Sequence, residues 1–378
     1  MVAAIVLVDT MFYAAISPLL PYYVHHFHLA KSQAGVLAAS YAAGTLIGSI
    51  PAGWLAARVG VRRTVISGLS LMIAASLAFG FAQSTGVLDV ARFVQGLGGA
   101  ASWSAGLAWL IERAPDDRRG EMIGASLAAA IAGALLGPLL GTVATATTPK
   151  FAFSAVAALG LGLLAWTLTE PAPGRAGAAG LGGLAPALRD RGVLTGMWLT
   201  TLAALLYGTL SVLTPLRLSQ LGASNVTVGL AFVSGAALAA VSSPVVGRVS
   251  DRRGWRRPIV TGLCLAAVWA VLLTLPDTVA LLFGLVVVAD MLFGVPYSPA
   301  GAMISAGAER VGLGQAYGFA LFNLAWAIGQ VIGGAGSAGL AQATTDAVPY
   351  SLLAGLCALS VAAITFNVGR PGATPRLR

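Results

Sequence analysis

Twelve long apolar runs dominate this 378-residue sequence. Each run is about 20 residues long, which is the length a helix needs to cross the hydrocarbon core of a bilayer. Only helices and closed barrels satisfy their backbone in lipid, and runs of this length are too long for barrel strands, so we predict an all-α, polytopic membrane protein. The runs lie near residues 2–24, 33–56, 64–83, 87–111, 121–145, 151–169, 194–219, 225–247, 258–275, 278–301, 315–340 and 348–368.

The composition agrees with a chain solvated mainly by lipid, because 57% of its residues are hydrophobic and only 9% are charged. The net charge of +9 comes from basic residues that gather in one set of alternate loops, whereas the opposite loops hold only Lys31, Lys150 and Arg217. Lys and Arg in short loops stay cytoplasmic. We therefore expect an integral plasma (inner) membrane protein with both termini in the cytoplasm and no nucleic-acid partner.

The sequence contains an internal repeat. A shift of 194 positions aligns Pro21 with Pro215, Gly35 with Gly229, Gly53 with Gly247, Gly120 with Gly314 and Gly124 with Gly318. We predict an N-terminal six-helix half at 1–170 and a C-terminal half at 193–378, joined by a Pro/Gly/Ala-rich cytoplasmic linker at 171–192. Parallel repeats of this kind describe a transporter architecture with a site near mid-membrane, and we expect a monomer.

Two aspartates, Asp9 and Asp290, lie inside apolar runs. A carboxylate near the bilayer centre costs about 2.5–3.5 kcal/mol, so such residues usually mark a substrate or ion path. In a dry cavity a carboxylate can hold a proton or pair with a cationic substrate, and the exclusion of one by the other is a basis for antiport. We expect both acids to couple protons. Arg92 either modulates a titrating acid or pairs with Asp89 one turn earlier.

Aromatic residues near these acids are candidates for the rest of a cation site, because ring faces attract cations; core or lipid packing is the alternative for each. With the acids they form the expected substrate-binding set of Asp9, Phe12, Tyr13, Tyr41, Tyr207, Asp290, Phe293, Tyr297, Phe322, Asn323 and Trp326. We find no phosphate-binding Gly-x-x-x-x-Gly-Lys loop and no metal-ligand spacing, and the cluster His25, His26 and His28 is expected at a wet interface. We therefore expect no enzyme activity, no metal and no cofactor, with a proton gradient as the energy source.

The loop after the second run has a repeated counterpart. It reads Gly53-Trp-Leu-Ala-Ala57-Arg58-Val-Gly60-Val-Arg62-Arg63, and the later copy reads Gly247-Arg248-Val-Ser-Asp251-Arg252-Arg253-Gly254. Both resemble the signature loop of the major facilitator superfamily. The resemblance implies twelve transmembrane helices in two pseudo-symmetric halves. We expect a short glycine turn, with basic residues that hold neighbouring helix ends. Ala57 stands where the family pattern has an acid, which Asp251 keeps.

Two further motifs resemble those of drug/proton antiporters. The fourth run contains Arg92-Phe-Val-Gln95-Gly96-Leu-Gly98, and the fifth contains Gly124, Gly133, Gly137, Pro138 and Gly141 at the antiporter spacing. Small residues on one face let helices approach closely, and Pro138 permits a bend. A tight, kinked helix pair of this kind would seal the path against leak, and generic small-residue packing is the alternative.

Across nearly the whole chain the sequence is similar to vesicular-type amine transporters and their bacterial relatives. Val8-Asp9-Thr10-Met11 and Val288-Ala289-Asp290-Met291 resemble two of their acidic helices, whereas Asn323 and Tyr41 replace a third acid and a lysine. The resemblance implies a proton-coupled antiporter that exports lipophilic or cationic small molecules, such as amines and drugs, by alternating access. An exporter of neutral solutes, such as sugars or amino-acid derivatives, is the alternative. A membrane sensor without transport activity is a third reading.

Overall fold

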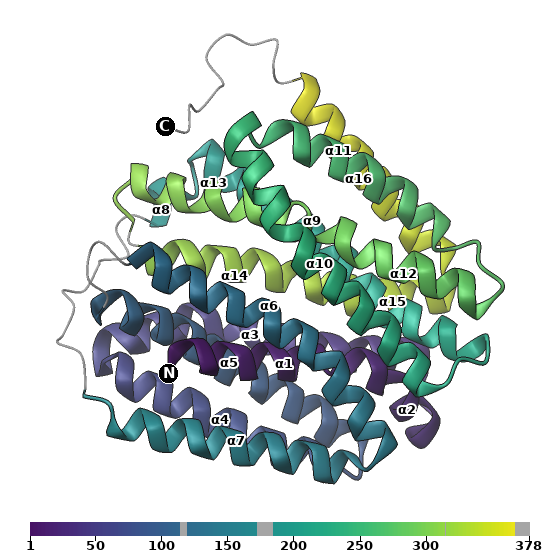
Figure 1. The fold of residues 1–378 in the computed structure, drawn as a ribbon, viewed down its shortest axis with the longest axis horizontal. Helices are drawn as coiled ribbons and strands as arrows, with labels where there is room; N and C mark the ends of the chain where they lie inside the picture. Colours follow the sequence, from purple (N-terminus) through teal and green to yellow (C-terminus); the bar gives the residue numbers. More distant parts are fainter. Residues whose placement is uncertain (114–118, 172–183, 314, 367–378) are drawn as a thin grey trace.

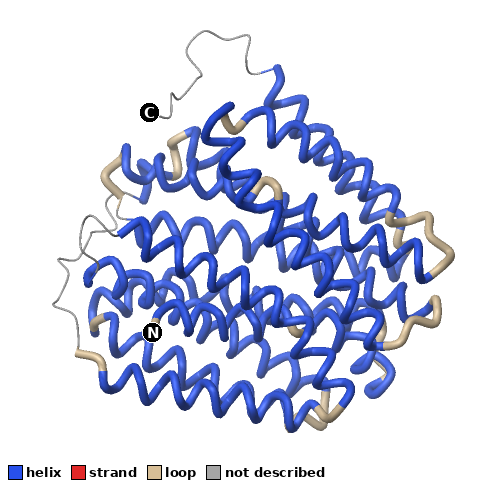
Figure 2. Tube along the Cα trace, in the orientation of Figure 1, coloured by secondary structure: helices blue, strands red, loops and turns tan. Residues whose placement is uncertain are grey.

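The computed structural model describes residues 1–113, 119–171, 184–313 and 315–366, and this part of the chain folds into helices without strands (Figure 2). The elements are α1 (Val2–Ala14), α2 (Ile16–Phe27), α3 (Lys31–Val59), α4 (Val61–Gly80), α5 (Thr85–Arg113), α6 (Arg119–Ala146), α7 (Pro149–Thr169), α8 (Leu184–Ala187), α9 (Arg191–Gln220), α10 (Asn225–Arg253), α11 (Arg256–Leu272), α12 (Val279–Gly294), α13 (Tyr297–Arg310), α14 (Gln315–Val331), the π-helix η3 (Ile332–Gly336), α15 (Ser337–Ala343) and α16 (Ala347–Phe366).

The helices combine into the predicted twelve-helix bundle, because α1 with α2, α12 with α13, and α14 with η3 and α15 each form one crossing. Ten of the crossings are long and apolar enough to span a membrane. The other two are α5, which carries polar and charged residues such as Asp89, Arg92 and Gln95, and α11, which has 17 residues. The prediction of an all-α membrane protein is confirmed.

Proline explains two of the breaks. The first helix is interrupted at Ala15, and Pro18 removes the hydrogen bond that Ala14 would otherwise accept. The tenth crossing is interrupted at Val295 and Pro296, and Pro299 likewise removes the bond to the carbonyl of Val295. Both predicted functional acids lie within two turns before such a break.

The two signature loops form the expected glycine turns. Gly60 separates α3 from α4 with φ of 95°, and Gly254 separates α10 from α11 with φ of 80°. Residues with a Cβ rarely adopt positive φ. The repeat therefore preserves the backbone conformation of the turn as well as its sequence.

Arginines beside these turns hold the ends of other helices. Arg62 donates from Nη2 to the carbonyl of Leu168 at 2.6 Å, and Arg256, 194 positions later, donates to the carbonyls of Ile364 at 2.9 Å and Thr365 at 3.1 Å. These carbonyls belong to the last turns of α7 and α16, where the helix dipole favours a cation.

Other signature residues lie at the surface of the same end. Arg58 stacks over the ring of Trp54 at 4.6 Å, Gly53 faces Tyr317 and Gly247 faces Ser298. Arg252 is exposed. Arg63 lies in the first turn of α4, while the side chain of Asp251 lies outside the described part of the structure.

An ion pair joins two helix ends in the C-terminal half. Arg310 donates to Asp190 at 2.9 Å, and the same carboxylate accepts the backbone N–H of Val193 at 3.0 Å, which caps α9. Burial raises the pKa of Asp190, but the hydrogen bonds from Arg310 and Val193 outweigh it and hold the pKa below its usual value. Asp190 is therefore ionised at neutral pH and fixes the start of α9.

The chain folds back and forth between two ends of the bundle. We call the end with the Gly60 and Gly254 turns the linker end, and the end with His28 and Phe81 the far end. In Figure 1 the first seven helices, purple to teal, occupy the lower part of the view, and α9 to α16, green to yellow, occupy the upper part. The predicted linker at 171–192 lies largely outside the described residues, and the division into two domains stays a prediction.

The two groups of helices meet along α3 with α14, η3 and α15, along α6 with α10, and along α2 with α9 and α10. Polar contacts reinforce this seam at the far end. Lys31 pairs with Asp346 at 2.5 Å, and the backbone N–H of Ser32 donates to Gln342 at 2.8 Å. The far end is therefore closed by contacts between the two groups.

Close helix crossings hold the first group together, and Gly96 lies at the tightest of them, between α5 and α3. A Cβ at this position would collide with the backbone carbonyl of Tyr41. We expect Gly96→Ala to force the helices apart and lower stability by about 1–3 kcal/mol, the usual cost of overpacking. Thermal unfolding of the purified protein measures the effect.

Gly86→Ala is the matched control on the same helix, because a Cβ there meets nothing within 4 Å. It should leave the unfolding midpoint unchanged. Equal midpoints for the two variants would contradict the importance of the α3–α5 crossing.

Candidate functional site

The carboxyl group of Asp9 is fully partnered. Its Oδ1 accepts a hydrogen bond from the Tyr41 hydroxyl at 2.8 Å, and its Oδ2 accepts one from the Trp103 indole N–H at 2.7 Å. Asp9 is only 2% exposed. Gly99 makes this arrangement possible, because a Cβ there would lie 2.7 Å from Oδ1 of Asp9. Two neutral donors on α3 and α5 thus hold the first acid in place.

Asp290 has a different environment. It is 8% exposed, and within the described ranges its carboxyl group makes neither a hydrogen bond nor an ion pair. Gly235 on α10 provides the space, because a Cβ there would lie 2.7 Å from the Cβ of Asp290. The hydroxyl of Tyr207 donates to the backbone carbonyl of Asp290 and so fixes the helix beside the break at Val295. The carboxylate is therefore held in position, but no side chain in the described part of the chain pairs with it.

Aromatic side chains gather beside each acid. Tyr13 lies 5.1 Å from Tyr41 and 5.0 Å from Trp326 between ring centroids, and this group adjoins Asp9 through Tyr41. A second group beside Asp290 contains Tyr207 and Tyr297, stacked at 5.8 Å, with Phe322 at 6.1 Å from Tyr297.

Helix α14 connects the two aromatic groups. Phe322 and Trp326 lie one turn apart on α14 and belong to different groups, and Asn323 follows Phe322 directly. Trp326 also brings α14 against the rings of Tyr13 and Tyr41 in the other half of the chain. The structure thus places most of the predicted binding residues around one region between the halves.

Phe12 lies apart from this region. It is 2% exposed, and its ring packs 5.2 Å from Phe153 within a cluster that includes Phe79. Phe293 is also fully buried, although its ring contacts Tyr207 edge-on at 6.4 Å. The geometry favours a packing role for Phe12, because its ring is turned towards α7 and away from Tyr13.

Arg92 is 1% exposed and donates to the backbone carbonyls of Phe12 and Tyr13, each at 3.1 Å. Both carbonyls belong to the last turn of α1, just before its break at Ala15, so the guanidinium ties α5 to the end of that helix. Arg92 also donates to Gln95 at 3.1 Å and lies 5.2 Å from the Tyr41 ring. The alternative pair with Asp89 is not among its hydrogen bonds.

The antiporter-like glycine stripe packs against the first helix. Gly133, Gly137 and Gly141 on α6 face the backbone of α1 and α2, where a Cβ would collide with Leu7, Ala14 and Ala15 respectively. Pro138 lies within α6 beside them, whereas Gly124 meets nothing within 4 Å. The stripe therefore allows α6 to pack closely against α1, the helix that carries Asp9.

Sequence reasoning missed Trp103, Gly99 and Gly235. A signal for Trp103 was present, because it lies 194 positions before Tyr297, which the aromatic pattern did identify. The roles of Gly99 and Gly235 depend on which residues pack against them from other helices, and the sequence does not show those contacts. Within the described residues no group of three or more His, Cys, Asp and Glu could hold a metal, and His25 instead contacts Ser219 at 3.3 Å.

Tyr41→Phe tests whether the hydroxyl stabilises Asp9. The ring and its packing remain, but one buried carboxylate oxygen loses its donor, and we expect a loss of about 1–3 kcal/mol in unfolding free energy. In the Asp9→Asn background the same substitution should cost much less, because coupled residues are not additive. A double-mutant cycle of unfolding free energies measures this.

Tyr22→Phe is the control for loss of a tyrosine hydroxyl, since Tyr22 is only partly buried. Full additivity of Tyr41→Phe and Asp9→Asn would show that the hydroxyl and the carboxylate do not interact in the folded protein.

Comparison with known proteins agrees with the fold. An MFS-type transporter from Metarhizium majus is 32% identical over 122 residues, which cover 31% of this chain and 26% of that protein. A probable vesicular acetylcholine transporter of Danio rerio is 31% identical over 147 residues, 33% of this chain and 29% of that protein. The arabinose-proton symporter of Escherichia coli is 35% identical over 105 residues, 28% of this chain and 22% of that protein.

These matches span about a quarter of each relative's length. A solved structure of a bacterial homologue of the human lysosomal transporter Spinster, in an inward-facing and unoccupied conformation, superposes with a TM-score of 0.76 at 16% identity, covering 97% of this chain and 93% of that chain. The sequence profile of the Major Facilitator Superfamily matches residues 2–334 and 197–377. The chain belongs to the Major Facilitator Superfamily.

Proposed function

We propose that this transporter is a proton-coupled antiporter that exports lipophilic or cationic small molecules, such as amines and drugs. The observation that carries the proposal is the buried carboxylate of Asp290, which has no partner within the ranges that the structure describes. An ionised carboxylate without a partner in a low-dielectric site is costly. A proton or a cationic substrate can remove that cost, but the two compete for the same oxygens.

The aromatic side chains around Asp290 support a cationic, partly apolar substrate. Tyr207 and Tyr297 stack beside the acid, and Phe322 extends the surface towards α14. A ring face contributes about 0.5–2 kcal/mol to cation binding, and the same rings accept flat or lipophilic groups. Asp290 would thus supply charge recognition, and the rings would supply most of the contact area.

Competition at Asp290 also gives a mechanism for coupling. When the halves rock, the site passes through an occluded state from which water is excluded. The empty, ionised form should cross this state slowly, because its charge is then unpartnered in a dry environment. The protonated form and the cation-loaded form cross readily, so each export step is followed by return with a proton. Asp9, Arg92 and the α6 stripe would set the position of α1 during this movement.

The similarity to a probable vesicular acetylcholine transporter supports a cationic substrate, because acetylcholine is a quaternary ammonium ion. The loop charges support an orientation with the linker end and both termini in the cytoplasm of the plasma membrane. The far end, closed by Lys31 with Asp346, would then face outward. We propose that the protein works as a monomer, with protons and small molecules as its partners and no cofactor.

A neutral-solute exporter is the second candidate. Asn323 lies between Phe322 and Trp326 in the sequence of α14 and offers an amide, which hydrogen-bonds to hydroxyl groups. Two of the relatives are named as proton symporters of the sugars arabinose and galactose. In this case Asp290 would handle only protons, and substrates would need no positive charge.

Asp290→Asn in proteoliposomes separates the candidates. A pH gradient should drive a cationic compound against its own gradient with the unaltered protein. The variant should lose this coupling and bind the cation roughly 10- to 150-fold more weakly, as expected when a charge-assisted contact of about 1.5–3 kcal/mol is removed. Uptake of a panel of cationic and neutral compounds measures both effects.

Asp277→Asn makes the same chemical change in an exposed loop and should retain full coupling. Undiminished accumulation of the cation by the Asp290 variant would reject Asp290 as the coupling site. Transport of neutral compounds alone would reject the cationic substrate and favour the second candidate.

A further inference from the structure

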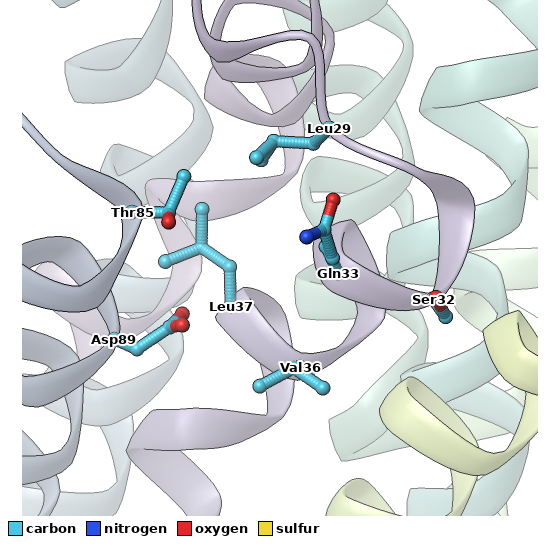
Figure 3. A pocket seen from close by; sticks show the side chains of 7 residues that line it. All are labelled: Leu29, Ser32, Gln33, Val36, Leu37, Thr85 and Asp89. Carbon is cyan, nitrogen blue, oxygen red and sulfur yellow. The ribbon is translucent and has the colours of Figure 1, made fainter.

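A separate cavity lies at the far end of the bundle, between the first turns of α3 and α5. Its volume is about 150 Å³, whereas a single water needs roughly 10–15 Å³. The cavity therefore has room for a small organic group. Seven residues line it, and they are Leu29, Ser32, Gln33, Val36, Leu37, Thr85 and Asp89 (Figure 3).

The cavity combines one acid with apolar walls. Asp89 is partly buried, and among the described residues its carboxyl group has neither a hydrogen bond nor an ion pair. Thr85 lies four residues earlier on the same face of α5 and adds a hydroxyl group that can accept a hydrogen bond. Leu29 and Leu37 supply the apolar surface opposite.

Gln33 adds a donor on the α3 side. Its Oε1 accepts the backbone N–H of Ala30 at 2.8 Å, which fixes the orientation of the amide. Figure 3 shows the amide nitrogen of Gln33 and the carboxyl group of Asp89 reaching towards the space on either side of Leu37. An anionic acceptor is thus offered on α5, and a neutral donor is offered on α3.

The basic residues nearest in sequence are already engaged elsewhere. Lys31 pairs with Asp346 across the seam at the far end. Arg92, one turn after Asp89, donates to the carbonyls of Phe12 and Tyr13. No basic residue of the described part of the chain is paired with Asp89, so a group from outside the chain can take that place.

The position of Asp89 along α5 indicates how deep in the bilayer a group bound to its carboxylate would lie. Asp89 lies about one turn inside the start of α5, and roughly 6 Å separate it from the helix end at 1.5 Å per residue. The neighbouring Val36, Val87 and Val90 are exposed, as expected for residues that face lipid. Asp89 therefore lies where the polar headgroup region of a bilayer meets its hydrocarbon core.

We propose that this cavity binds a primary ammonium group, carried by a small organic cation or by a lipid headgroup. The ammonium would donate hydrogen bonds to the Asp89 carboxylate and to the Thr85 hydroxyl. Its alkyl part would lie against Leu29 and Leu37, and the Gln33 amide would donate to an anionic group next to the ammonium, such as a phosphate. The site is separate from the one proposed at Asp290 and does not depend on what the protein transports.

Thermal unfolding of the intact protein in phosphatidylcholine nanodiscs tests this inference, because a ligand that binds the folded state raises the midpoint. One arm adds ethylammonium chloride against sodium chloride at equal ionic strength. The other arm replaces part of the lipid with phosphatidylethanolamine. We expect at least one arm to raise the midpoint in the unaltered protein, in Asp277→Asn and in Asp290→Asn, and Asp89→Asn should abolish the rise.

A rise with ethylammonium identifies a free cation as a ligand, and a rise with phosphatidylethanolamine identifies the headgroup. Asp89→Glu keeps the charge and should retain part of the rise, which separates loss of the carboxylate from misfolding. No rise in either arm overturns the proposal, as does a rise that persists in Asp89→Asn. A rise that only Asp290→Asn removes also overturns it, because the ligand would then occupy the other site.

Discussion

An ionised side chain inside a hydrocarbon layer has no water to solvate it, and the packing around the centre of this protein follows from that constraint. Three buried charged residues are accommodated in different ways. Asp9 accepts hydrogen bonds from Tyr41 and Trp103, and Arg92 donates to the carbonyls of Phe12 and Tyr13 in the last turn of α1. The backbone of Asp290 is fixed by Tyr207, but its carboxylate has no hydrogen-bond or ion-pair partner among the described residues. The first two residues are stabilised within the protein, whereas we propose that a proton or a cationic ligand neutralises the third.

The internal repeat gives the two halves one scaffold, but it does not give them the same chemistry. Tyr13 and Tyr207 lie 194 positions apart, and each joins an aromatic group beside an acid. By the same offset Tyr41, which donates to Asp9, corresponds to Gly235, which provides space for Asp290. A side chain that donates to an acid in one half is thus replaced by a glycine, without a donor, that packs closely against the acid in the other. This difference is the structural basis for assigning separate roles to the two carboxylates.

Much of the fold could be predicted from the sequence, because lipid imposes a length and a polarity on every crossing. The twelve runs, the repeat and the glycine turns at Gly60 and Gly254 all follow from local rules that need no partner helix. The breaks at Ala15 and Val295 were not predicted, although the prolines that cause them are visible in the sequence.

The candidate site was less predictable, because contacts between helices depend on rotations that apolar runs do not encode. Trp103 and Gly99 reach Asp9 only through the crossing of α5 with α3 and α1. Phe12 was expected at the site because it is near Asp9 in the sequence, but its ring packs against Phe153 in the core. Nor could the sequence indicate which of the two acids would lack a partner.

The central claim is that a proton and a cationic substrate compete for the carboxylate of Asp290. Proton release on binding tests it most directly, with purified protein in a weak buffer at a pH where the site is protonated. A cationic substrate added to the unaltered protein should release protons in proportion to the sites filled, and Asp290→Asn should release none. Equal proton release from the variant, or substrate binding without any release, would contradict the account.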